Sequence, residues 1–198
     1  MSLETVALLE KASGALVGET ERNRAALAAA LALVGEHEVG GQNKGPIVEF
    51  CIGYWVEETP EEWALWCAGF VSTMYLIAET VLALRSRLSR EPERGELEKA
   101  LGQPSPWRKI GSLQCSTLWE RASARKWTSL YPDAEAQPGD IVFFSGRAEP
   151  DKTKHVGLVV GQKGRTLLTV EGNAGNSVRR RTYDLSFERL YGLARPVW

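Results

Sequence analysis

An apolar segment begins at residues 66–71, with the sequence WCAGFV, and includes Cys67. Phe70, Met74 and Ile77 recur in it at the three- and four-residue spacing of a helix with a buried face. This spacing predicts a helix that carries Cys67 in its first turn. A cysteine there is expected to have a lowered thiol pKa, because unpaired backbone N–H groups at a helix N-terminus stabilise the thiolate. Taken alone, however, a buried cysteine is more often a filler of core space than a nucleophile.

Helices are expected on both sides of this segment. Residues 1–20 are expected to form a short helix or a poorly ordered leader, and an Ala/Leu-rich helix follows at about 21–34. A Gly-rich turn at 40–46 leads into a helix that starts at Pro46. Residues 85–133 are charged and helix-favouring, and we expect them to form a helical insertion.

The pattern changes to short runs of β-type residues after residue 137. The expected strands are 141–144, 155–160, 166–170, 178–183 and 191–195. Helices first and strands later predict an α+β fold, with N-terminal helices packed on an antiparallel β-sheet. A chain of 198 residues with 43% hydrophobic content is long enough for one well-packed domain, which we place at residues 21–198.

Composition excludes several kinds of function. Charged residues make up 25% of the chain and the formal net charge is -1, so a broadly basic nucleic-acid surface is not expected. The three cysteines, Cys51, Cys67 and Cys115, form no Cys-x-x-Cys pair, which argues against a zinc site and against a disulfide framework. We interpret Cys51 and Cys115 as buried fillers, and at least one thiol should be free.

The sequence also bears on targeting. Glu4 and Glu10 stand where a signal peptide has a basic start and an unbroken apolar run, so no signal peptide is expected. No stretch offers about eighteen uninterrupted apolar residues, since even 67–84 is interrupted by Ser72 and Glu79. The expected product is made in the cytoplasm and has no membrane span. A monomer is the default oligomeric state.

A cysteine nucleophile needs a base, and the chain has two histidines, His37 and His155. His37 lies between two glutamates at the polar end of a helix, where a solvated histidine is expected. His155 opens an apolar run, so a strand would hold its ring, and Gly157 would let another chain or a substrate approach closely. A hairpin to the next strand would bring Glu171 and Asn173 beside His155 to orient it. These two are equally compatible with a polar turn.

Five motifs support a resemblance to a known family. In order, they are Gly41–Val48, Trp66–Ser72, Pro138–Phe144, His155–Val160 and Thr169–Asn173. Their order and spacing resemble those of the cysteine, histidine-dependent amidohydrolase/peptidase (CHAP) family. The first is similar to the Gly-x-Asn-x-Gly-Pro segment of a CHAP-like subgroup in phage and bacterial proteins. Each motif is weak singly, but five in the family's order form a fairly specific signal from about residue 36 to residue 195.

The resemblance implies a papain-like fold, with the nucleophile on the first core helix and the base on the sheet. Cys67 would attack the scissile carbonyl, and His155 would take the thiol proton and later protonate the leaving amine. Glu171 would orient His155, and Asn173 would be a further polar member of the site. The implied substrate is peptidoglycan or its stem peptides. The bond cut would be a peptide bond or the N-acetylmuramoyl-L-alanine bond, and the reaction would pass through a thioester acyl-enzyme.

Other parts of the site follow less directly from the resemblance. The backbone N–H of Cys67 would be one oxyanion donor, and Gln42 or Asn43 is a guess for the second. Some family members hold calcium in an Asp-rich loop ahead of the cysteine. This chain has the Gly-rich turn there, so we expect no metal and no cofactor. Tryptophans of the insertion would line the groove or, as is more usual, pack in the core; they are Trp107, Trp119 and Trp127.

Two alternative functions remain open. The same cysteine and histidine chemistry would serve a protease, deamidase or transferase that acts on a protein. A catalytically inactive wall-binding module is the other alternative, and its cysteine would be unreactive at neutral pH. For the leading interpretation, the expected site of action is the cell wall or periplasm, reached after phage lysis, by virion delivery or by dedicated export.

Overall fold

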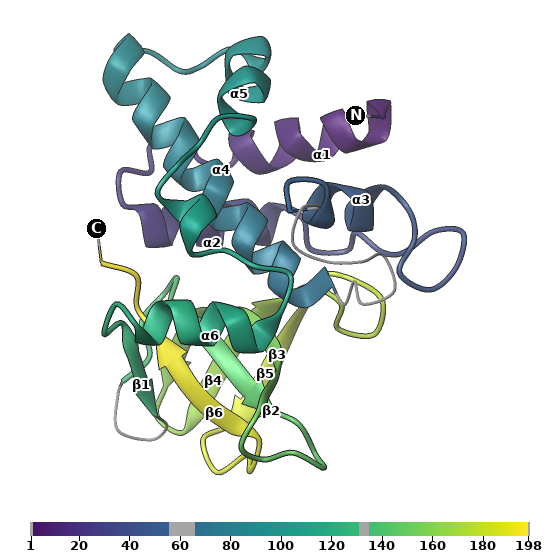
Figure 1. Ribbon diagram of the computed structural model, residues 1–198, viewed down its shortest axis with the longest axis vertical. Helices are drawn as coiled ribbons and strands as arrows, with labels where there is room; N and C mark the ends of the chain where they lie inside the picture. The colour runs from purple at the N-terminus through teal and green to yellow at the C-terminus, as the bar shows by residue number, and fades with distance from the viewer. Residues whose placement is uncertain (1, 56–65, 131–134, 198) are drawn as a thin grey trace.

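A computed structural model describes residues 2–55, 66–130 and 135–197 of the chain. Within these residues, the helices α1 to α5 gather at one end of the molecule and a six-stranded sheet forms the other end (Figure 1). A further helix, α6, lies across the sheet (Figure 1). The expected α+β class, with helices packed on an antiparallel sheet, is therefore confirmed.

The helices agree with the expected segments. They are α1 (Leu3–Gly14), α2 (Arg22–Ala32), α3 (Pro46–Ile52), α4 (Trp66–Leu88), α5 (Arg94–Leu101), the short 3-10 helix η3 (Trp107–Lys109) and α6 (Cys115–Ser123). Pro46 occupies the first turn of α3, where its fixed φ suits a helix and its missing N–H costs nothing. The chain just before Trp66 lies outside the described residues, and Cys67 is the second described residue of α4.

The strands form one antiparallel sheet in the order β1-β6-β2-β3-β4-β5. They are β1 (Thr128–Leu130), β2 (Ile141–Ser145), β3 (Thr153–Lys163), β4 (Thr166–Glu171), β5 (Arg179–Asp184) and β6 (Leu190–Ala194). The five expected strands are all present, and β3 extends further at both ends. The sequence did not predict β1, because a three-residue strand acquires its identity only by pairing with β6.

The segment 85–133 differs from a purely helical insertion. Its first residues are the last turn of α4, its middle forms α5, η3 and α6, and β1 near its end joins the sheet. Residues 131–134 lie outside the described part of the chain. The segment therefore contributes to both layers of the molecule.

Helix α4 is the centre of the core. It contacts α2 and α3 on the helical side and β3 on the sheet side, so every residue from Trp66 to Val81 is buried. Among the described residues, α4 is also the one helix long and apolar enough to cross a membrane, but 89% of its apolar window is buried inside the protein. That burial is typical of a core helix. No membrane span is indicated, and the helix lies too far from the N-terminus to be a signal sequence.

The sheet is buried on both faces at β2. Ile141 and Phe143 point into the main core, whereas Val142 and Phe144 point into a smaller apolar cluster on the other face. Neighbouring residues of a strand point to opposite faces, so both layers hold β2 in place. The result is a firm support for β3, which pairs with β2 from Ile141 to Ser145.

The turn before β2 joins the sheet to the helices. Gly139 has a φ of 87°, and a Cβ there would lie 2.3 Å from the backbone oxygen of Asn23 in α2. The hydroxyl of Tyr75 in α4 donates a hydrogen bond to the Gly139 carbonyl. The neighbouring Asp140 is buried and accepts two hydrogen bonds from the guanidinium of Arg195. The Pro138–Phe144 motif thus sets the position of the sheet relative to the helices.

Helix α1 packs into the same core as the rest of the helical layer. Leu9, Ala12 and Leu16 are fully buried, and α1 contacts α2, α3 and α4. Of the two forms expected for residues 1–20, the helix is the one present. Residues 3–14 are therefore part of the packed structure that surrounds α4.

Replacing Leu9 with alanine is expected to lower the free energy of unfolding by about 2 to 5 kcal/mol, because a fully buried leucine leaves the core. The matched control is Leu3→Ala on the same helix. Leu3 is 89% exposed, so this change should stay within about 0.5 kcal/mol. Urea denaturation measures both variants. Equal effects would show that α1 is not part of the folded core.

Candidate active site

The β3–β4 hairpin brings His155 and Glu171 together. His155 Nε2 lies 2.8 Å from Glu171 Oε2, which is the geometry of a strong hydrogen bond between an imidazole and a carboxylate. Glu171 is 1% exposed, whereas 28% of the His155 side chain is exposed. Glu171 therefore makes the direct contact with His155 that its expected orienting role requires.

Gly157 makes room for this contact. It lies two residues after His155 on β3, and a Cβ built on it would lie 2.5 Å from Glu171 Cγ. Residues two apart on a strand share a face, so the Glu171 side chain crosses over Gly157 to reach His155. The close approach that the sequence predicted at Gly157 is made by Glu171.

Two further side chains hold the Glu171 carboxylate. Thr169 Oγ1 donates a hydrogen bond to Oε1, and the Tyr183 hydroxyl donates one of 3.2 Å to Oε2. Burial and the negative charge of Glu171 together raise the pKa of Tyr183, so its hydroxyl stays protonated and remains a donor. Both oxygens of the buried carboxylate are satisfied, which fixes the side chain and leaves its charge facing His155.

Cys67 lies opposite the other nitrogen of the ring. The thiol is 2% exposed and is hydrogen bonded to His155. Because Nε2 is engaged by Glu171, Nδ1 is the nitrogen that faces the sulfur. The pKa of Cys67 is held well below its ordinary value, most of all by a hydrogen bond from Cys115. The bond and charge of His155 and the backbone N–H of Ala68 lower it further, against the opposing effect of burial.

The pKa of His155 is shifted in the opposite direction to that of Cys67. Burial by itself lowers the pKa of His155, but the hydrogen bonds and charges of Cys67 and Glu171 outweigh it and raise this pKa to about 10. A thiol that loses its proton easily beside a histidine that keeps one is a thiolate–imidazolium pair. Near neutral pH, the two pKa shifts therefore favour an anionic sulfur beside a protonated ring.

Cys115 is the residue that the sequence did not place in the site. Its sulfur lies 3.6 Å from the Cys67 sulfur, which suits an S–H···S hydrogen bond and is too long for a disulfide. The hydrogen bond with Cys67 is the largest cause that raises the pKa of Cys115, and burial and the charge of Cys67 raise it further. Cys115 therefore stays a neutral donor. It is the first residue of α6, 48 positions from Cys67. No local spacing could have revealed the contact.

The other predicted site residues take different positions. Asn173 follows β4 with a φ of 57° and lines a cavity beside His155, but its side chain makes no hydrogen bond to the ring within the described residues. Gln42 is exposed, and Asn43 is held through its backbone N–H by Glu38. Neither side chain is bonded to Cys67 among the described residues. His37 is exposed and its backbone pairs with Ser177, and it is not among the groups that shift the pKa of Cys67.

The tryptophans of the insertion pack rather than line the site. Trp107 is fully buried and stacks on Tyr75 with ring centroids 4.5 Å apart. Trp119 packs edge-on against Phe143 of β2. Trp127 borders a separate cavity near Pro104. Cys51 is a buried filler in α3, and burial raises its pKa.

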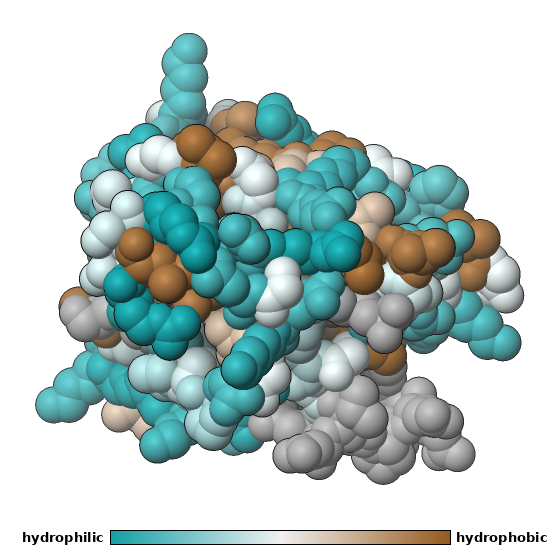
Figure 2. Space-filling model, turned by 90° about the horizontal axis from the view of Figure 1, so that it is seen from above, coloured by the Kyte–Doolittle hydropathy of each residue, from teal (hydrophilic) through white to brown (hydrophobic). Residues whose placement is uncertain are grey.

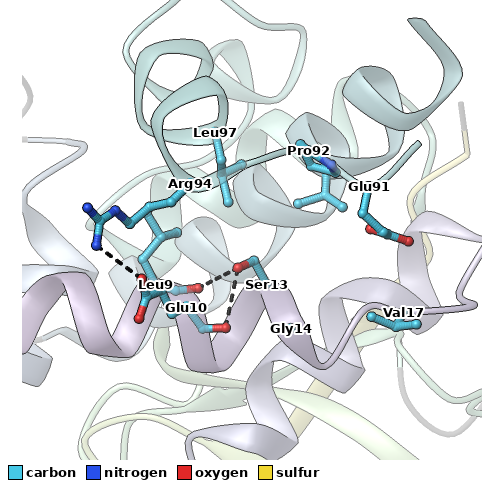
Figure 3. Close-up of a pocket in the computed structure, with 10 residues that line it drawn as sticks. Leu9, Glu10, Ser13, Gly14, Val17, Glu91, Pro92, Arg94 and Leu97 are labelled. Atoms are coloured by element: carbon cyan, nitrogen blue, oxygen red, sulfur yellow. Dashed lines mark hydrogen bonds and ion pairs between the residues drawn. The ribbon is translucent and has the colours of Figure 1, made fainter. Parts of the chain in front are cut away.

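The helical end of the molecule has a cavity of its own. Figure 2 shows the helical end, where hydrophilic side chains cover most of the visible surface and apolar ones form separate patches. A cavity of about 250 Å³ lies between α1 and α5, and its polar groups bond to one another. Ser13 bonds to the Leu9 carbonyl and Arg94 pairs with Glu10 (Figure 3). In the described ranges, no three His, Cys, Asp or Glu side chains are grouped to hold a metal ion.

Gly157→Ala tests whether the gap in β3 positions Glu171. The added methyl group would push the carboxylate away from His155, and we expect the rate at which iodoacetamide alkylates Cys67 at neutral pH to fall by about tenfold. Gly161→Ala is the matched control, since a Cβ at that position of β3 meets open space. Mass spectrometry follows both reactions. A wild-type rate in Gly157→Ala would contradict the role of this gap.

Cys115→Ala tests the sulfur contact through pH. As pH falls through the lowered pKa of Cys67, the thiolate gains a proton and alkylation slows. Without the Cys115 donor that pKa rises, so the midpoint of this decline should move to higher pH by about one unit. Cys51→Ala, which removes a cysteine that is not among the causes of the Cys67 pKa shift, should leave the midpoint in place. An unchanged midpoint in Cys115→Ala would refute the hydrogen bond.

No protein-family model, curated protein or solved structure matches this chain. The site is therefore defined by its own geometry and chemistry. The site is a chain of contacts: Cys115 contacts Cys67 on α4, Cys67 contacts His155 on β3, and His155 contacts Glu171 on β4.

Proposed function

We propose that this chain is a papain-like cysteine hydrolase of the CHAP type that cleaves an amide bond of bacterial peptidoglycan. The observation that carries the proposal is the series of contacts from Cys67 to His155 to Glu171. In this series the thiol pKa is lowered and the imidazole pKa is raised. Perturbed pKa values of opposite direction on adjacent groups are typical of a nucleophile and its acid–base partner. The order of the five sequence motifs supports the family assignment.

The first half of the reaction uses the thiolate–imidazolium pair as it stands. The Cys67 sulfur attacks the carbonyl carbon of the amide and forms a tetrahedral intermediate. His155 then gives its Nδ1 proton to the amide nitrogen, the C–N bond breaks, and the amine leaves. The acyl group remains on Cys67 as a thioester. The backbone N–H of Cys67 is proposed as one donor to the oxyanion.

The second half regenerates the enzyme. His155, now neutral, takes a proton from water, and the oxygen attacks the thioester carbon. The C–S bond breaks, the acid product leaves, and the proton held by His155 again balances the Cys67 thiolate. Glu171 accepts a hydrogen bond from Nε2 throughout, so the ring keeps its orientation while the charge on it changes.

The substrate assignment rests on the family resemblance and on the exposure of His155. The ring faces a cavity of about 490 Å³, so a substrate can reach the acid–base group even though the thiol is buried. Peptidoglycan offers both amide bonds that the resemblance implies. A protease, deamidase or transferase acting on protein would use the same three residues, and the bond released distinguishes these functions.

Cys67→Ala is expected to abolish the clearing of purified cell walls, with a rate at least about 10³-fold below wild type, because the nucleophile is removed. The matched control is Cys51→Ala, a buried cysteine outside the site, which should clear walls at nearly the wild-type rate. Loss of turbidity measures the reaction, and mass spectrometry of the fragments identifies the bond. Clearing by Cys67→Ala at the wild-type rate would end the proposal.

A further inference from the structure

The cavity beside His155 has an unusual balance of charge. Its volume of about 490 Å³ falls in the range of small-ligand sites. Glu171 is the one carboxylate among its described lining residues, and that carboxylate is engaged by His155, Thr169 and Tyr183. The remaining charged groups of the lining are all cationic; they are Arg147, Lys154, Arg181 and Arg189.

Three of these cations have no acidic partner in the part of the chain that the structure describes. Lys154 pairs with Glu149 at 2.7 Å, so its charge is largely balanced. Arg147, Arg181 and Arg189 form no ion pair within the described residues. They come from the β2–β3 loop, from β5 and from the segment before β6, and so converge on the cavity from separate parts of the chain. Unpaired cations gathered in a recess attract a negatively charged ligand.

The cavity also has an aromatic side. Phe144, Tyr183 and Phe187 pack together, with ring centroids 4.8 Å apart for Phe144 and Tyr183 and 5.1 Å apart for Tyr183 and Phe187. The Arg189 guanidinium lies 4.9 Å from the centre of the Phe187 ring. Stacking on a ring holds the planar guanidinium in place and leaves its edge N–H groups free for a carboxylate.

We propose that this cavity is a subsite for a carboxylate-bearing residue of the peptide substrate. The arginines bind the carboxylate, and the aromatic rings contact the apolar part of the same residue. The inference rests on the proposed function, since it identifies the substrate of that site as a peptide with a free carboxylate near the scissile amide. The aromatic side favours such a residue over a bare phosphate, which has no apolar part to bury.

Two small reagents test the subsite without knowledge of the natural substrate. Iodoacetate and iodoacetamide alkylate the same Cys67 sulfur and have nearly the same size, but only iodoacetate is an anion. The ratio of their rate constants therefore reports the local potential, because any change in thiol reactivity cancels. In the wild-type protein, this ratio should exceed that of an uncharged free thiol such as 2-mercaptoethanol and should fall as salt is added.

Arg181→Gln and Arg189→Gln are each expected to lower the ratio by about threefold or more, with little change in the iodoacetamide rate. The matched control is Arg180→Gln. Arg180 is exposed and adjoins Arg181 on β5, but it points to the opposite face and does not line the cavity. Its replacement removes the same charge from the protein and should leave the ratio within the experimental error.

A second arm uses Cys67→Ala protein and two synthetic stem peptides, one with free carboxylates and one with carboxamides in their place. Calorimetry should give tighter binding of the carboxylate form, and Arg181→Gln in this background should remove the difference. The subsite is refuted if Arg181→Gln and Arg189→Gln keep the wild-type rate ratio, or if Arg180→Gln lowers it equally. Failure of the proposed function would appear separately: the wild-type protein would leave cell walls intact, while its iodoacetate to iodoacetamide rate ratio would still be raised.

Discussion

The carboxylate of Glu171 is a buried charge, and the surrounding strands are arranged to satisfy it. Taking a carboxylate out of water costs several kcal/mol unless it is paired and hydrogen bonded. His155 on β3, Thr169 on β4 and Tyr183 on β5 supply the partners. The backbone ladders of the sheet hold these three strands in register, so the partners cannot separate without breaking those ladders. The Glu171 carboxylate and the pairing of the strands therefore both fix the His155 ring. Gly157 leaves the space through which the Glu171 side chain reaches that ring.

The helical layer brings the thiol to this fixed ring. Helix α4 is buried from Trp66 to Val81, where α2, α3 and the sheet enclose it. The first described turns of α4 pack closely against the end of β4 and against α3. A Cβ at Gly172 would lie 2.5 Å from the Phe70 Cβ, and a Cβ at Gly69 would lie 2.8 Å from the Cys51 carbonyl oxygen. Because of these close approaches, the packing that buries the helix also fixes the position of the Cys67 thiol.

Two neighbouring cysteines acquire opposite properties from this arrangement. Cys67 faces the positively charged ring of His155 and becomes the anion, whereas Cys115 faces that anion and remains a neutral donor. The pKa values of the two thiols are shifted in opposite directions, and His155 contacts the thiol whose pKa is lowered. The same ring borders the cavity that Arg181 and Arg189 also line.

Helical spacing and strand alternation in the sequence predicted the α+β class, the helix that carries Cys67 and five of the strands, because these patterns are local. His155 was chosen because His37 was set aside, and a hairpin placed both Glu171 and Asn173 beside it. The orienting role of Glu171 followed from the family resemblance, and in the described residues it is Glu171 that contacts the ring. The strand β1, the packing role of Trp107 and the contact of Cys115 with Cys67 depend on segments far apart in the chain. So does the convergence of Arg147, Arg181 and Arg189. Only the tertiary structure decided these, because contacts between distant segments arise from packing, and no spacing along the chain encodes them.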